Sequence, residues 1–283
     1  MLPATGYNVR AENRQILDDP SITGVELTFE RADEPLRVRR YLGDQEFEYV
    51  GIHALKLSPA SPEPPRPDSI SALRDIALEN GAQSISDHLG FTRGTSNGVE
   101  MGHFAPPPYT ETALDATSRN VDLIMREFRG LAFYIENIAY PFRFEGTMEE
   151  ADFLIRLIER TGCGWLLDIH NVYANSLNHG YDAREFISAI TSVATSIEMH
   201  MAGGFFDERT GFYIDSHSEP ISAEVWDLYR FALEEGGTKV KAAFIERDQN
   251  FPDDEGWREE ARMLRQIAVE VLESTTEQEA LPC

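Results

Sequence analysis

The feature that most constrains the fold is a short apolar run that ends on a polar, metal-ligand type of side chain and recurs along the chain. The clearest case lies in residues 164–180, GWLLDIHNVYANSLNHG. Residues 165–167 are typical of a buried strand. Asp168, His170, Asn171 and His179 follow within twelve residues. Two explanations suit this pattern, namely a metal site or a polar network that caps the strand.

Similar apolar runs alternate with helical patterns over the whole chain, and this alternation favours a parallel sheet. The length of 283 residues suits one (β/α)8 barrel, which needs about 250. We find no GxGxxG or GxxxxGK[ST] loop, so a closed barrel is preferred to a nucleotide-binding sheet. We therefore predict a single-domain TIM-type barrel over residues 1–274 and a polar tail over 275–283. The predicted strands cover residues 7–10, 24–29 (with Glu30 at the end), 49–57, 83–88, 131–137, 165–167, 196–202 and 240–246.

The intervening segments predict helices and two long loops. Thr147 and Glu150 have the spacing of a capping box, so one helix is expected to begin at Thr147. The loops cover residues 90–110 and 203–218, and long loops in compact domains are often functional. The predicted helices cover residues 12–18 (one turn), 70–80, 110–128, 147–161, 182–194, 222–235 and 257–274.

The composition restricts partners and location. The net charge of −24 repels nucleic-acid phosphates and anionic membranes. Cys163 and Cys283 form neither a disulfide framework nor a CxxC zinc site. No apolar run is long enough for a transmembrane helix, and no signal peptide is evident. We therefore expect a cytoplasmic protein with no nucleic-acid or membrane partner.

Chemistry in a (β/α)8 barrel lies at the carboxyl ends of its strands. A single polar residue there more often caps a loop than binds a metal, but six on one rim are harder to dismiss. Clustered carboxylates without cations would repel one another, and metal ions remove that conflict. The ligand set lacks thiolates, which favours two or three ions of iron, manganese or zinc in an open site. The strand ends supply His53, His88, Glu136, Asp168, His200 and Glu246, and the flanking loops add His103, His170, Asn171, His179, Asp215 and His217.

These residues alone do not separate iron oxidation from two-metal hydrolysis or isomerisation. The order of several motifs, however, resembles the multinuclear non-haem iron-dependent oxidative enzymes, the group that includes the catalytic subunit of methanobactin biosynthesis. The resemblance covers residues 52–267. The motifs are SDHLGF, PPPYTETALD, IEN, TGCGWLLDIHNVYANSLNHG, EMHMAGG, IDSHSEPI and FIERDQNFP.

The resemblance implies a barrel with two or three iron ions, mixed ferrous and ferric, at its carboxyl rim. It implies O2 as co-substrate and oxidative modification of a ribosomally made peptide, typically at cysteine, with a partner protein that recognises the peptide leader. Glu136 is the expected bridging carboxylate, and Asp168 and His179 are the catalytic candidates, the latter as an acid–base or a support for a ligand. The ligands implied by position are His53, His88, Glu136, Asp168, Asn171, His200, Asp215, His217 and Glu246.

Two rival functions remain at this point. One is a divalent-metal isomerase or hydrolase of the xylose-isomerase-like barrel type, although such an isomerase usually needs a lysine near the metal, and Lys56 is the one candidate near a strand end. The other is a non-catalytic metal-binding subunit that presents a peptide to another enzyme. His103 is expected to be a loop residue near the mouth, and the pattern does not require His170 as a ligand.

Overall fold

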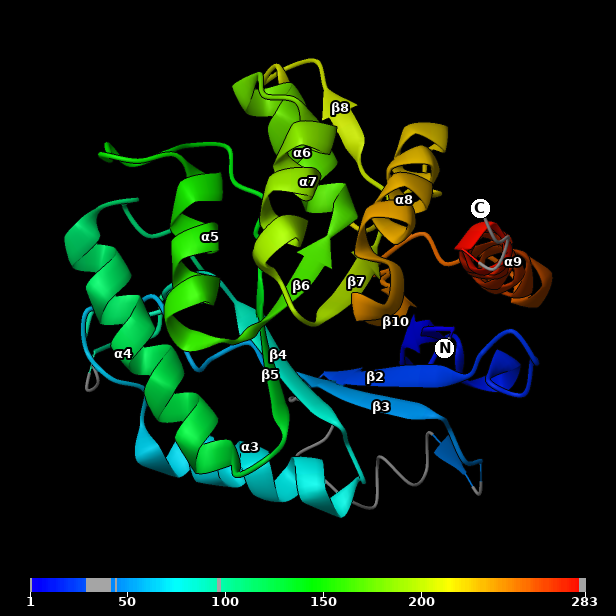
Figure 1. The fold of residues 1–283 in the computed structure, drawn as a ribbon, viewed down its shortest axis with the longest axis horizontal. Coiled ribbons are helices and arrows are strands. Elements are labelled where there is room, and N and C mark those ends of the chain that lie inside the picture. The colour runs from blue at the N-terminus through cyan, green and yellow to red at the C-terminus, as the bar shows by residue number, and fades with distance from the viewer. Residues whose placement is uncertain (1, 29–41, 44, 96–97, 280–283) are drawn as a thin grey trace.

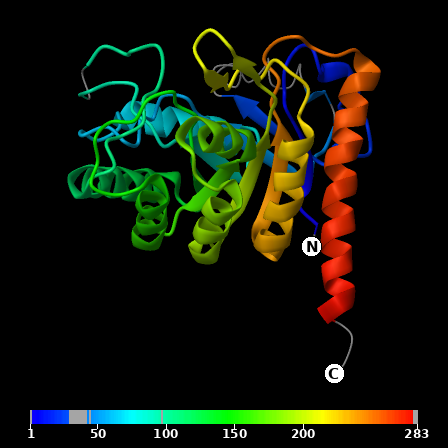
Figure 2. The same cartoon turned by 90° about the horizontal axis from the view of Figure 1, so that it is seen from above.

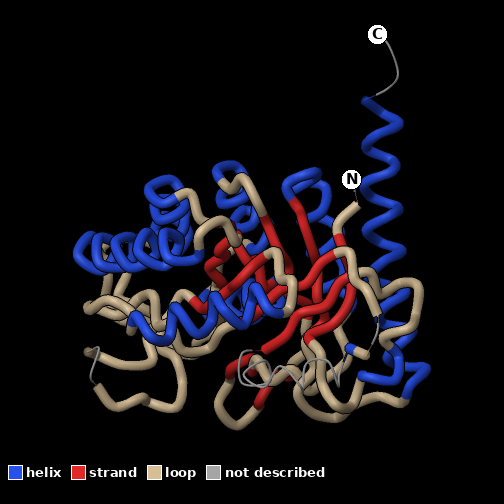
Figure 3. The backbone as a smooth tube through the Cα atoms, turned by 90° about the horizontal axis from the view of Figure 1, so that it is seen from below, coloured by secondary structure: helices blue, strands red, loops and turns tan. Residues whose placement is uncertain are grey.

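The computed structural model describes residues 2–28, 42–43, 45–95 and 98–279. Eight parallel strands close into a barrel with helices outside it, which confirms the predicted TIM-type (β/α)8 fold (Figures 1 and 3). Each strand hydrogen-bonds to its neighbours, and β1 closes the barrel between β10 and β2. The strands are β1 (Ala4–Asn8), β2 (Gly24–Thr28), β3 (Tyr49–His53), β4 (Ser84–His88), β5 (Ala132–Glu136), β6 (Gly164–Asp168), β7 (Ile197–Met201) and β10 (Val240–Ile245).

The helices pack around the strands, and the long loops gather at one face. Figure 2 shows the small β8–β9 hairpin on the side of the barrel away from the C-terminus. Within the described ranges, no helix combines the length and apolarity needed to cross a bilayer. The helices are η1 (Arg14–Ile16), α3 (Pro67–Glu79), α4 (Glu111–Phe128), α5 (Glu150–Thr161), α6 (Ile169–His179), α7 (Ala183–Val193), α8 (Ala223–Gly236), η2 (Gly237–Lys239) and α9 (Asp254–Glu279).

Helix α6 was not predicted, and it changes the meaning of residues 164–180. The polar residues after β6 do not form a loop, because the chain turns directly from Asp168 into a helix. The Asp168 side chain caps this helix and accepts a hydrogen bond of 2.7 Å from the backbone N–H of Asn171. His170 and Asn171 therefore lie in the first turn of α6, next to the strand end.

Other boundaries also differ from prediction. The capping box is wrong, because α5 begins at Glu150 without a side-chain cap and the backbone N–H of Thr147 donates to the carbonyl of Tyr109 instead. The loop over 203–218 contains strands β8 (Phe205–Asp207) and β9 (Phe212–Ile214). Helix α9 includes residues 275–279 of the predicted tail. The predicted strand end at Phe29 and Glu30 lies outside the described residues.

Strand register brings the polar strand ends to one level. His88 pairs with Glu136, and Asp168 pairs with His200. Gly164 is required where β6 approaches β5, since a Cβ there would lie 2.3 Å from the Tyr134 ring. The resulting rim of the barrel carries most of the predicted site residues.

Asn137 holds the end of β6 in place. Its side-chain oxygen accepts hydrogen bonds from the Trp165 indole at 3.1 Å and the Asp168 backbone N–H at 3.2 Å. Its amide nitrogen donates to the Asp168 carbonyl at 2.9 Å. The buried amide thus fixes the strand end that presents Asp168, which gives the asparagine of the IEN motif a structural role.

Candidate metal centre

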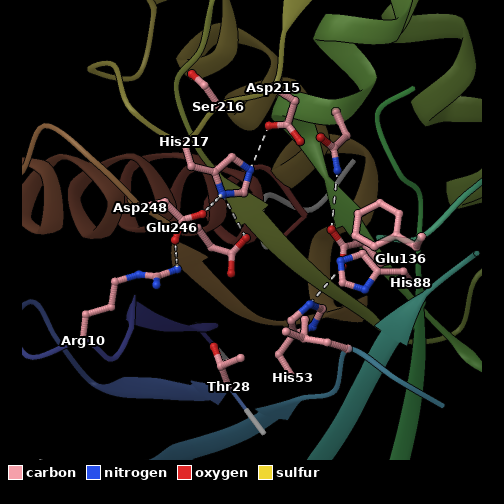
Figure 4. A pocket seen from close by; sticks show the side chains of 13 residues that line it. Arg10, Thr28, His53, His88, Glu136, Asp215, Ser216, His217, Glu246 and Asp248 are labelled. Carbon is pink, nitrogen blue, oxygen red and sulfur yellow. Dashed lines mark hydrogen bonds and ion pairs between the residues drawn. The ribbon is translucent and has the colours of Figure 1, made fainter. Parts of the chain in front are cut away.

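A pocket of about 460 Å³ opens at the carboxyl ends of the strands. Figure 4 shows side chains from opposite sides of the barrel converging on it. The pocket brings together residues from β2, β3, β4, β5, α6 and the loops after β9 and β10. Its lining comprises Arg10, Thr28, His53, Leu55, His88, Phe104, Glu136, Asn171, Asp215, Ser216, His217, Glu246 and Asp248.

Glu136 lies at the centre of the cluster. Its Oε2 atom is 3.5 Å from His53 Nε2 and 3.6 Å from His88 Nε2. Its Oε1 atom faces His200 Nδ1 at 3.8 Å. The two oxygens of one carboxylate thus face different imidazoles, which is the arrangement expected of a bridging ligand between two cations.

Asp168, His200 and Glu246 form the middle of the cluster. Each offers a ligand atom within 4.8 Å of neighbouring ligand atoms, in groups that also include Glu136 and His217. Glu246 Oε2 is 3.3 Å from His200 Nδ1 and 3.5 Å from His217 Nδ1. This carboxylate therefore connects the middle group with the loop that follows β9.

A third group lies between α6 and that loop. His217 Nε2 is 2.8 Å from Asp215 Oδ1, and His170 Nδ1 is 2.9 Å from the same oxygen. Asn171 lies close by and donates to Glu136 Oε1 at 3.5 Å. His217 has a positive φ of 50°, a conformation uncommon outside glycine, so the loop holds this imidazole in a strained backbone position. The structure therefore brings the nine predicted ligands into one cluster.

The electrostatics of the cluster favour a positive charge inside it. Burial, with Glu136 and Asp215 nearby, raises the pKa of Asp168 well above its ordinary value. Burial also acts to raise the pKa of Glu136, but His88, His200 and His53 outweigh it and lower that pKa to about 2. Burial acts to lower the pKa of His200, yet Glu246 and Glu26 raise it well above the usual value. Bound cations can supply the positive charge that protons otherwise provide.

Unpaired atoms show that the residues fit such cations. Buried donors and acceptors are normally hydrogen-bonded, and leaving one unpaired costs about 1–3 kcal/mol. Several acceptor atoms that face the cluster have no hydrogen-bond partner, namely Glu136 Oε2, Asp168 Oδ2, Asn171 Oδ1 and His200 Nδ1. Carboxylate, amide and imidazole donors together suit iron, manganese or zinc.

Two candidate site histidines and one candidate lysine lie apart from this cluster. His179 ends α6, about 15 Å along the helix from its start. Its Nε2 lies 2.9 Å from the Tyr140 carbonyl, and its ring stacks on Tyr140. His103 is exposed on the loop after β4, as expected. Lys56 lines neighbouring pockets, and the described lining of the main pocket contains no lysine.

Sequence reasoning missed some residues of the cluster. Glu26 is fully buried in β2, 3.0 Å from His200, and Asn8 of β1 hydrogen-bonds to Glu26. A carboxylate inside an otherwise apolar strand was the available signal. The family pattern does not require His170 as a ligand, but in the structure His170 forms part of the third group. The reason is that α6 begins directly after β6, which places His170 in the first turn of a helix next to the strand end.

The fold and the cluster define a (β/α)8-barrel protein with candidate metal ligands at its carboxyl rim. The sequence matches the family described as "RiPP precursor modification enzyme MbnB/TglH/ChrH" over residues 11–269, and the chain belongs to this family. RiPP denotes a ribosomally synthesised and post-translationally modified peptide. The family resemblance predicted from the motifs is thereby confirmed.

The chain also matches curated relatives over most of its length. The chain is 34% identical to a UPF0276 protein of Rhizorhabdus wittichii over 77% of this chain and 76% of the relative. It is 30% identical to UPF0276 protein VP3015 of Vibrio parahaemolyticus over 88% of this chain and 87% of the relative.

Among solved structures, a D-psicose 3-epimerase in the presence of D-fructose matches with a TM-score of 0.61 and 9% identity over 95% of this chain and 99% of that one. An endonuclease IV from Thermus thermophilus matches with a TM-score of 0.56 and 13% identity over 95% and 100% of the two chains. At such low identities these two neighbours show the fold alone.

Proposed function

We propose that this protein is an iron- and oxygen-dependent enzyme that oxidises a ribosomally made peptide, with a cysteine as the modified residue. The observation that carries the proposal is the cluster around Glu136, in which one carboxylate faces imidazoles on two sides. Family membership supports a peptide precursor as the substrate. We further propose cytoplasmic location and a partner protein that recognises the peptide leader.

The ligand groups suggest two or three cation positions. His53, His88 and Glu136 would hold one, and Glu136, Asp168, His200 and Glu246 would hold a second. Asp215 and His217, with Asn171 or His170, would hold a third. Iron, when bound, would supply electron transfer to O2 and Lewis acidity toward a thiolate. The protein ligands would fix the ions, and the open pocket leaves room for co-substrate and thiolate without a cysteine ligand from the protein.

The mouth of the pocket has groups suited to orienting a peptide. Arg10 and Asp248 form an ion pair there, and both line the pocket with Ser216 and Thr28 (Figure 4). Because these polar side chains line the pocket, we expect them to contact a peptide that enters it. Phe104 stacks on the His88 ring with centroids 4.0 Å apart, so an apolar wall adjoins the proposed ligands and excludes water from that side.

Exposed apolar side chains around the same face support a polypeptide substrate. Large apolar groups exposed together often mark an interaction site. Phe142 and Phe144 contact each other after β5, and Phe144 stacks near Phe91 at 6.4 Å. The exposed set on strand β8 and on loops after the strands includes Val99, Met101, Phe142, Phe144, Phe205, Phe206 and Phe251.

The test begins with the metal. Protein expressed in iron-replete medium and purified anaerobically should contain two to three iron ions per chain, measured by elemental analysis and Mössbauer spectroscopy. Co-expression with a cysteine-containing precursor peptide encoded beside the gene should change the peptide mass, and a Cys→Ser peptide should stay unmodified. Full activity with only zinc or magnesium bound would overturn the iron assignment. Turnover of D-fructose in place of a peptide would favour the alternative function as a divalent-metal isomerase.

A further inference from the structure

Strands β1 and β2 provide none of the proposed ligands, yet their polar side chains face the cluster. Glu26 is 0% exposed and Asn8 is 1% exposed, so both are removed from water. Strand pairing places Asn8 directly beside Glu26, and Thr28 lies on the same face two residues further along. Glu26 also offers a ligand-type oxygen near His53 and His200, so the role of this buried carboxylate must be argued from its contacts.

Glu26 belongs to a series of hydrogen bonds that ends at His200. The Glu26 carboxylate lies 3.0 Å from His200 Nε2. The Asn8 amide nitrogen donates to Glu26 Oε2 at 2.9 Å and to Glu246 Oε1 at 3.1 Å. The Thr28 hydroxyl donates to Asn8 Oδ1 at 3.0 Å, which fixes which end of the amide faces the carboxylates.

This series of hydrogen bonds determines which ring nitrogen of His200 is available to bind a metal. An ionised carboxylate only accepts hydrogen bonds, so the proton of a neutral His200 ring must be on Nε2. The Nδ1 lone pair then faces Glu246 Oε2 at 3.3 Å and Glu136 Oε1 at 3.8 Å, with no hydrogen-bond partner of its own. Three electron-pair donors that converge in this way can all be satisfied by one cation.

We propose that Glu26, oriented by Asn8, is a positioning residue that holds His200 in the tautomer whose Nδ1 binds the metal. This inference rests on the proposed metal centre. Carboxylates that hydrogen-bond to a metal-binding imidazole increase its basicity and fix its orientation, and their removal typically weakens metal binding about 10- to 100-fold. Asn8 also donates to Glu246, so β1 and β2 support two proposed ligands through one amide.

The direct test is the affinity of anaerobic, metal-free protein for Fe(II), measured by competition with a chelator, with Co(II) absorption spectra as a second probe of coordination. Glu26→Ala should weaken binding at one position about 10- to 100-fold and change the Co(II) spectrum. Glu26→Gln should restore part of that loss, because its amide oxygen can still accept from Nε2. If the alanine variant does not fold, as judged by circular dichroism, the glutamine variant carries the test.

A matched control is Glu198→Gln. Glu198 is also a buried carboxylate and lies on the same strand as His200, but it accepts a hydrogen bond from Tyr49 at 2.5 Å. This change should leave Fe(II) affinity unaltered. In a His200→Ala background, Glu26→Ala should weaken the remaining Fe(II) binding no further, because Glu26 acts through that imidazole.

The outcomes separate this inference from the proposed function. If the wild type binds Fe(II) and Asp168→Ala weakens binding while Glu26→Ala does not, the positioning role is wrong and the metal centre stands. A further loss of Fe(II) affinity when Glu26→Ala is added to His200→Ala would also refute the positioning role. If the wild type binds no Fe(II) or Co(II), the proposed function and this inference are both wrong.

Discussion

Asp168 has two separable roles, and substitutions can distinguish them. Its Oδ1 atom caps α6 by accepting from the Asn171 backbone N–H at 2.7 Å. Its Oδ2 atom is buried, has no hydrogen-bond partner and belongs to the proposed ligand set. Asp168→Asn keeps a capping oxygen and removes the charge. Asp168→Ala removes both functions.

Without metal, the two variants should differ in the free energy of unfolding. Asparagine and aspartate are similar N-caps, whereas loss of the cap costs about 1 kcal/mol. Burial and nearby carboxylates oppose ionisation of Asp168 and raise its pKa. Asp168→Asn should therefore be at least as stable as the wild type, and Asp168→Ala should be less stable by about 1 kcal/mol or more, since a small cavity is also left.

With Fe(II) present, the order of the free energies of unfolding should change, and the wild type should become more stable than Asp168→Asn. A ligand at 100 times its Kd stabilises the folded state by about 2.7 kcal/mol. If Asp168→Asn weakens that site 100-fold, the same Fe(II) concentration gives only about 0.4 kcal/mol. The wild type should thus gain about 2 kcal/mol more than Asp168→Asn when Fe(II) is added.

Anaerobic urea unfolding, with chelator and with Fe(II), measures both effects on the same protein. Circular dichroism of the unligated variants shows whether the barrel forms. Equal stabilisation of wild type and Asp168→Asn by Fe(II) would remove Asp168 from the ligand set. Equal stability of the asparagine and alanine variants without metal would refute the capping role.

Three further predictions concern residues around the centre. Burial raises the pKa of Glu198 to about 7, so wild-type stability should fall by up to about 3 kcal/mol between pH 4.5 and 7, and Glu198→Gln should flatten this dependence in urea titrations. Gly204→Ala should cost about 1–3 kcal/mol and lower the iron content, since its Cβ would lie 2.2 Å from the Ile214 carbonyl oxygen; an unchanged iron count would contradict this. His179→Phe should retain wild-type iron content, because His179 contacts Tyr140 rather than the cluster. Burial lowers the pKa of His179, so wild-type stability should decrease relative to His179→Phe as pH falls from about 7 to 5, and a constant difference would refute that.

Much of the fold follows from local pattern. Apolar runs of strand length alternate with helical periodicity, and only a few architectures accommodate that alternation in one chain of this length. Helix ends were less certain. Thr147 has the spacing of a cap, yet a tertiary hydrogen bond to the Tyr109 carbonyl takes its backbone N–H, so the helix begins three residues later. Sequence spacing does not reveal such a competing partner.

The candidate site was predictable where a ligand-type residue ends a strand. His53, His88, Glu136 and Asp168 are each the last residue of their strand, so the barrel rule alone places them together. Glu26 could not be found by that rule, because it lies inside β2 and acts through contact with another strand.

The sequence by itself determined the barrel class, the rim of imidazoles and carboxylates, and the family, because each depends on residue type and order along the chain. Tertiary structure decided which ligand-type residues share a centre. His179 and Asn171 belong to one helix, but the rise of that helix carries His179 away while its first turn keeps Asn171 beside Glu136. It also decided that Glu26 faces His200, since only closure of the barrel brings residues 174 positions apart within 3.0 Å.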